Sequence, residues 1–195
     1  LKRVLSGSSE PFFTFINLNS AHSPYNPPPK FKSEFEEYFD EWEAVERTAV
    51  RSLADNGYEY MMGDRTATEA AWELMQCWYD GEIAYIDSLL GTLFEFLRER
   101  DMYDDTAIIV TSDHGEHFGE DGLMYHQFSL SELLLNVPLI IKWPNQTEAK
   151  RSTELVSLTD IAPTCLDLLT GGFPDEMDGR SLRSDTPPDA VFAEY

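Results

Sequence analysis

The pattern of apolar and polar positions along the chain predicts strands that alternate with helices. Three short runs are rich in apolar and β-branched residues, and we interpret them as buried strands: 11–19, 106–111 and 136–143. Between the first two runs, apolar residues recur at helical spacing from Leu74 to Leu97. This spacing predicts a long helix from Thr68 to about Arg100, with Thr66 or Thr68 as its N-cap. The order is typical of an α/β fold in which helices flank a largely parallel sheet.

The rest of the chain extends this alternation. A second helix is expected from Ile161 to about Leu169 and should end at the glycines 171–172. Residues 191–195 indicate one more strand, so residues 145–195 carry the last helix and strands. Residues 31–65, rich in glutamate and aromatic side chains, are interpreted as a lid or insertion over the sheet edge. The charges of this segment are more typical of a solvated face than of a binding site.

Candidate chemistry lies where the predicted strands end. The strand that begins at Thr106 ends in Asp113, His114 and Gly115, and His22 follows the first strand in the proline-rich loop 21–29. In open α/β sheets, sites gather outside the carboxyl ends of the strands. Asp113 and His114 offer one oxygen and one nitrogen ligand, which suits a divalent cation. Two ligands cannot complete the roughly six that a hard cation takes, so the others must come from elsewhere in the protein or from the substrate.

Two loop histidines add to this picture. His22 and His126 could converge on the same site as the candidate ligands. If both rings are protonated, they would donate hydrogen bonds to an oxyanion rather than bind the metal. A lone loop histidine is more often a surface or structural residue, but the similar placement of His22 and His114 at strand exits favours a functional role.

Composition narrows the possible partners. The chain of 195 residues has 14 Lys and Arg against 36 Asp and Glu, a formal net charge of −22, which argues against a nucleic-acid partner. Two interpretations remain: a solvated acidic surface adapted to high salt, or a cation-binding surface. Because the acids are spread along the chain, the first is favoured. The cysteines, Cys77 and Cys165, are expected to be buried free thiols.

Targeting signals are not apparent in this sequence. No stretch approaches the roughly 18 apolar residues of a membrane span, and no signal peptide is visible. The chain starts at Leu1 without a methionine, so we expect it to be a piece of a longer protein. Its localisation and its oligomeric state stay unknown at this stage.

Several motifs, in this order, resemble the C-terminal two-thirds of a sulfatase, a branch of the alkaline phosphatase superfamily. The matching pieces cover most of the chain: Phe12-Phe-Thr-Phe-Ile-Asn17, Ala21-His-Ser-Pro-Tyr25, Tyr79-Asp-Gly-Glu-Ile-Ala-Tyr-Ile-Asp87, Ile108-Ile-Val-Thr-Ser-Asp-His-Gly-Glu116, Gly119-Glu-Asp-Gly122, Asn136-Val-Pro-Leu-Ile-Ile141, Ser157-Leu-Thr-Asp-Ile-Ala-Pro-Thr164 and Asp178-Gly-Arg-Ser-Leu182. The resemblance implies a partial alkaline-phosphatase-like sheet flanked by helices, with residues 1–195 forming the C-terminal two-thirds of a catalytic domain.

The resemblance also implies an activity. It is the metal-dependent hydrolysis of a small-molecule or glycan sulfate ester, usually with Ca²⁺, although Mg²⁺ or Mn²⁺ would also suit. On this basis Asp113 and His114 match a pair of metal ligands, and His22 matches a histidine that contacts the sulfate group. His126 stands where the family usually provides a lysine to the sulfate, and Lys142 lies too far along the chain to replace it.

The sequence departs from the family in one further respect. The family's formylglycine nucleophile is made from the first residue of Cys/Ser-x-Pro-x-Arg, and an Asp-Asp pair supplies its first metal carboxylates. Neither Cys77, Cys165 nor the pair Asp104-Asp105 matches these motifs, so both are expected upstream, and stand-alone activity of this chain is not expected. Two other functions stay open: a phosphatase, phosphodiesterase or phosphoryl transferase of the same superfamily, and a non-catalytic acidic domain that binds cations.

Overall fold

A computed structural model of the chain describes residues 11–36, 44–184, 188 and 190–194, which fall into two compact units. The first unit comprises the residues up to 108 together with 116–128 and 142–145. The second comprises 109–115, 129–141 and the residues from 146 onwards. Each unit is described by itself below.

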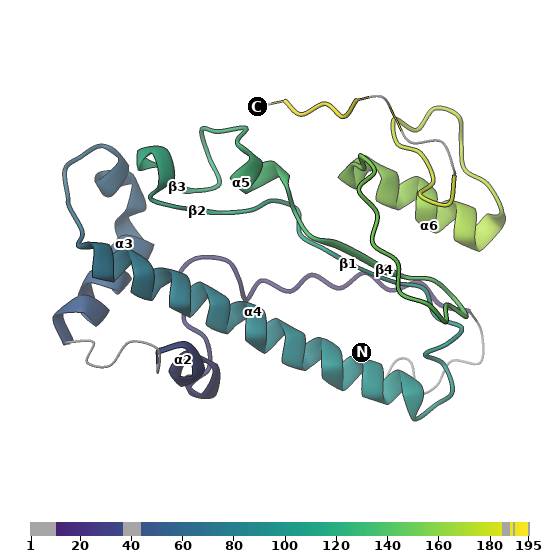
Figure 1. Ribbon diagram of the computed structural model, residues 1–195, viewed down its shortest axis with the longest axis horizontal. Helices are drawn as coiled ribbons and strands as arrows, with labels where there is room; N and C mark the ends of the chain where they lie inside the picture. Colours follow the sequence, from purple (N-terminus) through teal and green to yellow (C-terminus); the bar gives the residue numbers. More distant parts are fainter. Residues whose placement is uncertain (1–10, 37–43, 185–187, 189, 195) are drawn as a thin grey trace. The chain divides into compact units, whose positions relative to one another are not determined.

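The first unit is built along a long helix, α4 (Glu69–Arg98), which runs through the centre of Figure 1. The Thr68 hydroxyl accepts a hydrogen bond from the backbone N–H of Ala71 at 3.1 Å, which satisfies one of the unpaired donors at the helix start. Glu69 in the first turn and Arg98 in the last complement the helix dipole. The predicted helix is therefore confirmed, and its cap is Thr68 rather than Thr66.

Two shorter helices, α2 (Pro29–Glu36) and α3 (Ala44–Met61), pack against α4. Trp78 on α4 and Leu53 on α3 lie at the centre of the buried cluster, with exposed fractions of 2% and 0%. The other buried members of this cluster are Tyr25, Val50, Ala71, Leu74, Met75, Cys77 and Met124. Much of segment 31–65 is therefore helical. Whether it acts as a lid stays a prediction.

A small antiparallel hairpin completes the first unit. Strand β2 (His117–Phe118) pairs with β3 (Met124–Tyr125), and the short helix η1 (Glu120–Gly122) connects them. Gly119 has a φ of 104°, a left-handed conformation that glycine adopts without a steric penalty. The hairpin packs on α3 and α4, so the helices support the residues that follow Asp-His-Gly.

The prediction of a buried strand over residues 11–19 is wrong for the described structure. The segment has no strand geometry, and Phe13, Phe15 and Ile16 are exposed by 66%, 82% and 44%. A buried strand needs hydrogen-bonding neighbours, and none of the described residues forms a ladder with this segment. Only Phe12 packs against an apolar cluster, the one around Phe96 and Leu97 at the end of α4.

The second unit contains the strand pair that carries the candidate ligands. Strand β1 (Ile108–Thr111) pairs with β4 (Leu139–Lys142), which confirms both predicted strands at shorter lengths. The burial prediction is wrong, because the side chains of β1 are only partly buried up to Val110 and Thr111 is exposed. Among the described residues β1 has one strand neighbour, whereas a central strand is paired on both sides and packed on both faces.

Helix α6 (Ile161–Thr170) confirms the second predicted helix, and α5 (Glu132–Leu135) is a single turn before β4. The short helix η2 (Leu158–Asp160) leads into α6 through a capping box between Ser157 and Asp160. Gly171 ends α6 in the left-handed conformation, with a φ of 77°. The predicted strand at 191–195 is wrong for residues 191–194, which are irregular and exposed, and Tyr195 lies outside the described residues. No described helix has the length and apolar character that crossing a membrane requires.

Candidate active site

The two candidate metal ligands, Asp113 and His114, follow β1 directly in the second unit. An Asp113 carboxylate oxygen accepts the backbone N–H of His114 at 3.1 Å, and the Ser112 hydroxyl donates to the His114 carbonyl at 2.7 Å. The Gly115 N–H donates to the Leu134 carbonyl at 2.9 Å, which ties this turn to α5. These bonds fix the backbone from which both candidate side chains project.

The hydrogen bonding of His114 fits a metal ligand. Its Nδ1 lies 2.8 Å from the Gly115 carbonyl oxygen, and a carbonyl only accepts, so Nδ1 carries the proton. The Nε2 of the neutral ring then holds the lone pair, and it lies 3.8 Å from the Asp113 Oδ2. A histidine that donates its other N–H to a backbone carbonyl is the usual arrangement around bound metals. The donor set therefore fits one nitrogen and one oxygen ligand of a divalent cation.

These two donors do not form a complete metal site. Within the described ranges, no group of three or more histidine, cysteine, aspartate or glutamate residues is arranged to hold a metal ion. The expectation that the remaining ligands come from elsewhere in the protein or from the substrate stays a prediction.

The structure brings the two loop histidines together in the first unit. The ring centroids of His22 and His126 lie 5.8 Å apart, with an angle of 59° between the planes. The Nδ1 of His22 lies 2.7 Å from the Ser23 carbonyl oxygen, so this nitrogen also carries the proton. The Nδ1 of His126 lies 3.2 Å from a carboxylate oxygen of Glu116. Both rings thus use Nδ1 for a protein hydrogen bond.

Helix α3 holds the loops of both histidines. Asn56 has non-helical dihedrals, a φ of −131° and a ψ of 31°, and interrupts the hydrogen-bond ladder of the helix. The Ala54 carbonyl beside this kink accepts from the Ser23 hydroxyl at 2.9 Å and from the Tyr125 hydroxyl at 3.1 Å. The Gly57 N–H donates to the Tyr125 hydroxyl at 2.9 Å. One backbone carbonyl therefore contacts the residue after His22 and the residue before His126.

Helix α4 fixes the proline-rich loop from the other side. The Asn26 N–H donates to the Glu82 carboxylate at 2.9 Å, and burial raises the pKa of Glu82 while this hydrogen bond opposes the shift. At Gly81, an added Cβ would lie 2.9 Å from the Pro27 ring, so the glycine allows the loop to approach the helix closely. These contacts position the segment that contains His22.

Two residues of this site were given no role from the sequence: Glu116 and Tyr25. The Glu116 side chain is 5% exposed, and its second carboxylate oxygen accepts from the Tyr25 hydroxyl at 2.8 Å. The sequence feature that could have indicated a role for Glu116 is its position directly after Asp-His-Gly. The contact with Tyr25 joins residues 91 positions apart, so local pattern could not show it.

Lys142 lies away from the candidate site residues of its unit. Its ammonium group donates to the backbone carbonyls of Tyr103, Asp104 and Thr106 at 2.5, 2.7 and 3.0 Å. These bonds fasten the turn between α4 and β1. The expectation that Lys142 does not replace a sulfate-binding lysine stays a prediction.

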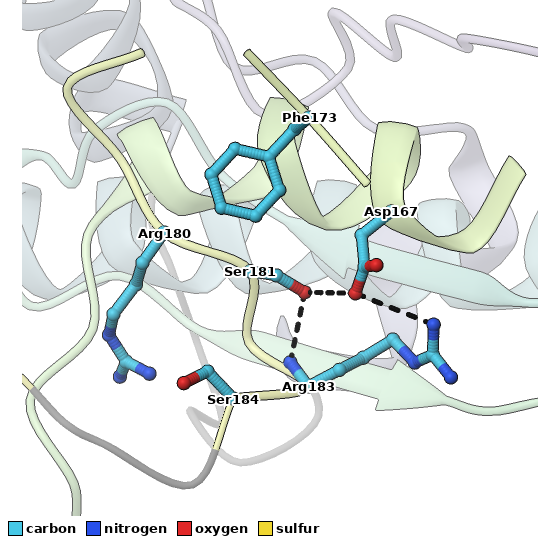
Figure 2. A pocket seen from close by; sticks show the side chains of 6 residues that line it. All are labelled: Asp167, Phe173, Arg180, Ser181, Arg183 and Ser184. Carbon is cyan, nitrogen blue, oxygen red and sulfur yellow. Dashed lines mark hydrogen bonds and ion pairs between the residues drawn. The ribbon is translucent and has the colours of Figure 1, made fainter. Parts of the chain in front are cut away.

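A surface pocket near the end of the described chain involves none of the predicted site residues. Figure 2 shows its lining side chains, with Asp167 accepting from the Ser181 hydroxyl at 2.7 Å and contacting Arg183 at 3.4 Å. The Arg180 N–H donates to an Asp160 carboxylate oxygen at 2.9 Å. At Gly179 an added Cβ would lie 2.0 Å from the Thr159 carbonyl oxygen. The motif Asp178-Gly-Arg-Ser-Leu182 therefore fastens this segment to η2 and α6.

Comparisons with known proteins show the family to which this chain is related. A model of the Sulfatase family matches residues 1–172. A putative extracellular sulfatase Sulf-1 homolog of Caenorhabditis elegans is 30% identical over 186 residues, which cover 93% of this chain and 26% of that protein. An N-acetylglucosamine-6-sulfatase of Capra hircus is 26% identical over 189 residues, 90% of this chain and 32% of its own length.

A solved structure gives the same fold. The phosphonate monoester hydrolase of Agrobacterium radiobacter superposes with a TM-score of 0.69 at 26% identity, over 93% of this chain and 39% of the other. The family match covers most of the chain, so the chain belongs to the sulfatase family and has a partial alkaline-phosphatase-like α/β fold. It spans well under half the length of each of these relatives.

Proposed function

We propose that this chain supplies part of the metal and sulfate site of an enzyme that hydrolyses sulfate esters. The observation that carries the proposal is the pair of strand-end ligands: the Nε2 of His114 lies beside the Asp113 carboxylate, and its Nδ1 donates to the Gly115 carbonyl. A divalent cation held there would neutralise charge on the ester oxygens. Among divalent cations we propose Ca²⁺, because it accepts carboxylate ligands in flexible geometry.

His22 and His126 are proposed to bind the sulfate group. Their rings lie 5.8 Å apart, and both contact the protein through Nδ1. A protonated imidazole donates from Nε2, and hydrogen bonds from charged donors to an oxyanion are about twice as strong as neutral ones. The two rings could thus stabilise negative charge that develops on sulfuryl oxygens. No residue of this chain is proposed as the nucleophile, because the sequence has no Cys/Ser-x-Pro-x-Arg.

Segment 31–65 is proposed to act as a lid that helps to select the substrate. Tyr58, near the end of α3, is 48% exposed, and its hydroxyl donates to Gln127 at 3.2 Å. Its ring lies 6.3 Å from that of Phe128, which is 58% exposed. Phe128 follows His126 by two residues, and the exposed aromatic pair suits the apolar face of a sugar or aryl ring. The similarity to an N-acetylglucosamine-6-sulfatase supports a glycan sulfate ester as the substrate class.

A second candidate is hydrolysis of a phosphonate or phosphate ester at the same residues, since a solved structure with this fold is a phosphonate monoester hydrolase. Both functions are tested by assaying the full-length protein on an aryl sulfate, an aryl phosphonate monoester and an aryl phosphate, with Ca²⁺ and with a chelator. We expect metal-dependent turnover of the sulfate ester. Turnover of a phosphorus ester alone favours the second candidate, and calcium binding without any turnover favours a non-catalytic domain.

The acidic composition is proposed to be an adaptation to high salt. The net charge of −22 produces strong self-repulsion, which salt screens by shortening the Debye length from about 10 Å at 0.1 M to about 3 Å at 1 M.

A further inference from the structure

Glu116 is a buried carboxylate with two specific partners. Its side chain is 5% exposed, one oxygen lies 3.2 Å from the His126 Nδ1, and the other accepts from the Tyr25 hydroxyl at 2.8 Å. Among the residues that the structure describes, His126 is the only ion-pair contact of Glu116.

The contact with Glu116 determines the chemical form of His126. An ionised carboxylate only accepts, so the His126 Nδ1 carries a proton and the neutral ring has its lone pair at Nε2. A buried carboxylate that accepts from Nδ1 and orients the ring of a histidine is a known device at catalytic centres.

Tyr25 fixes the carboxylate in turn. The ring is 2% exposed and lies 5.6 Å from the rings of both Tyr79 and Phe118, so its position is set by packing. Burial, together with the negative charge of Glu116, raises the pKa of the Tyr25 phenol, so the hydroxyl remains a donor at neutral pH. One carboxylate oxygen is therefore committed to Tyr25, and the other faces His126.

We propose that Glu116 and Tyr25 are positioning residues for His126: the Glu116 carboxylate, held by the Tyr25 hydroxyl, accepts from the His126 Nδ1–H and orients the ring so that Nε2 is directed towards an anionic oxygen of the substrate. This rests on the proposed function, in which His126 binds the ester group. The same arrangement links three segments of the first unit: the proline-rich loop through Tyr25, the residue after Asp-His-Gly, and the end of β3.

A double-mutant cycle in the full-length protein tests the coupling. Glu116→Gln keeps the size of the side chain and an acceptor for Tyr25 but removes the charge. We expect it to lower kcat/KM by about ten- to a hundred-fold, as is common for residues that orient a functional histidine. In a His126→Ala background the same substitution should change kcat/KM by less than about two-fold. An equal loss in both backgrounds would show that Glu116 does not act through His126.

Two further variants separate positioning from folding. Tyr25→Phe keeps the packed ring and removes only the hydroxyl, so it should lower kcat/KM in the same direction as Glu116→Gln, and by less. Asp121→Asn is the matched control, because Asp121 is an exposed carboxylate in the same hairpin with a φ of 55°, which asparagine tolerates. It should leave kcat/KM unchanged. A loss in this control equal to that in Glu116→Gln would assign the effect to general charge and overturn the proposal.

A spectroscopic measurement does not depend on which ester is hydrolysed. In protein labelled with ¹⁵N-histidine, the His126 resonances, identified by their loss in His126→Ala, should report the Nδ1–H form in the wild type. In Glu116→Gln this preference should be lost, because an amide can donate as well as accept. An Nε2–H form in the wild type would overturn the positioning proposal. If instead only a phosphorus ester is turned over, the sulfate assignment fails, while the coupling between Glu116 and His126 is still measured on that ester.

Discussion

The backbone around Gly115 leaves no room for a side chain, which yields a prediction with a calculable size. An added Cβ would lie 1.9 Å from the Leu133 carbonyl oxygen, 3.0 Å from its carbonyl carbon and 3.2 Å from the Leu134 Cα. All three are backbone atoms that cannot rotate away. Real Cβ contacts stay above 3.0 Å, so Gly115→Ala requires the two segments to separate by 3.0 − 1.9 = 1.1 Å.

This separation also breaks the hydrogen bond from the Gly115 N–H to the Leu134 carbonyl, which is 2.9 Å long. Steric strain of about 1–3 kcal/mol and a lost hydrogen bond of about 0.5–1.5 kcal/mol together lower the free energy of unfolding by about 1.5–4.5 kcal/mol. Because Gly115 follows His114 directly, the same displacement should weaken metal-dependent activity.

The measurement is urea denaturation of the full-length protein followed by circular dichroism, with activity assayed in parallel at several metal concentrations. Gly91→Ala is the matched control. Gly91 is exposed in the middle of α4, and nothing lies within 4 Å of its added Cβ, so alanine should stabilise the helix by about 0.5–1 kcal/mol. The steric argument is wrong if Gly115→Ala unfolds within about 0.5 kcal/mol of the wild type and keeps its metal response.

Four further outcomes are expected. Asp113→Asn should lower turnover by orders of magnitude with the fold intact by circular dichroism, and near-normal turnover would remove the metal assignment. His126→Ala should weaken the binding of both substrate and free sulfate in calorimetry, and unchanged affinity for both would make His126 structural. Phe128→Ala should raise KM for glycan or aryl sulfates by about ten-fold while inorganic sulfate binds as before, whereas an unchanged KM would contradict a substrate contact by the Tyr58–Phe128 pair. The melting temperature should rise between 0.1 and 2 M NaCl, and a flat or falling response would contradict adaptation to high salt.

Sequence reasoning succeeded where the determining interactions are local. The α4 helix follows from apolar spacing and from the Thr68 cap, both of which lie within a few residues of the structure they determine. The strand that ends just before Asp113 and His114 followed from its local run of apolar and β-branched residues, while their role as metal ligands stays a prediction. Likewise Gly171 ends α6 because a left-handed residue is required at that point.

The same reasoning failed where partners are distant in sequence. Residues 11–19 have the composition of a strand, but a strand exists through its neighbours, and the described residues provide none for this segment. Glu116 contacts Tyr25, and the loops of His22 and His126 both contact the Ala54 carbonyl of α3. None of these relations has a periodic signature, so they required the folded structure.

The Ala54 carbonyl has a consequence for how this protein can vary. It accepts hydrogen bonds from the Ser23 and Tyr125 hydroxyls, so the link between the two histidine loops depends on a main-chain oxygen. A substitution changes the side chain but keeps the backbone carbonyl, so any small apolar residue at position 54 would preserve that oxygen. Position 54 can therefore drift among descendants without breaking the link, whereas Ser23 and Tyr125 cannot. A search for positions that change together would detect Ser23 and Tyr125, and it would overlook the Ala54 carbonyl that links them.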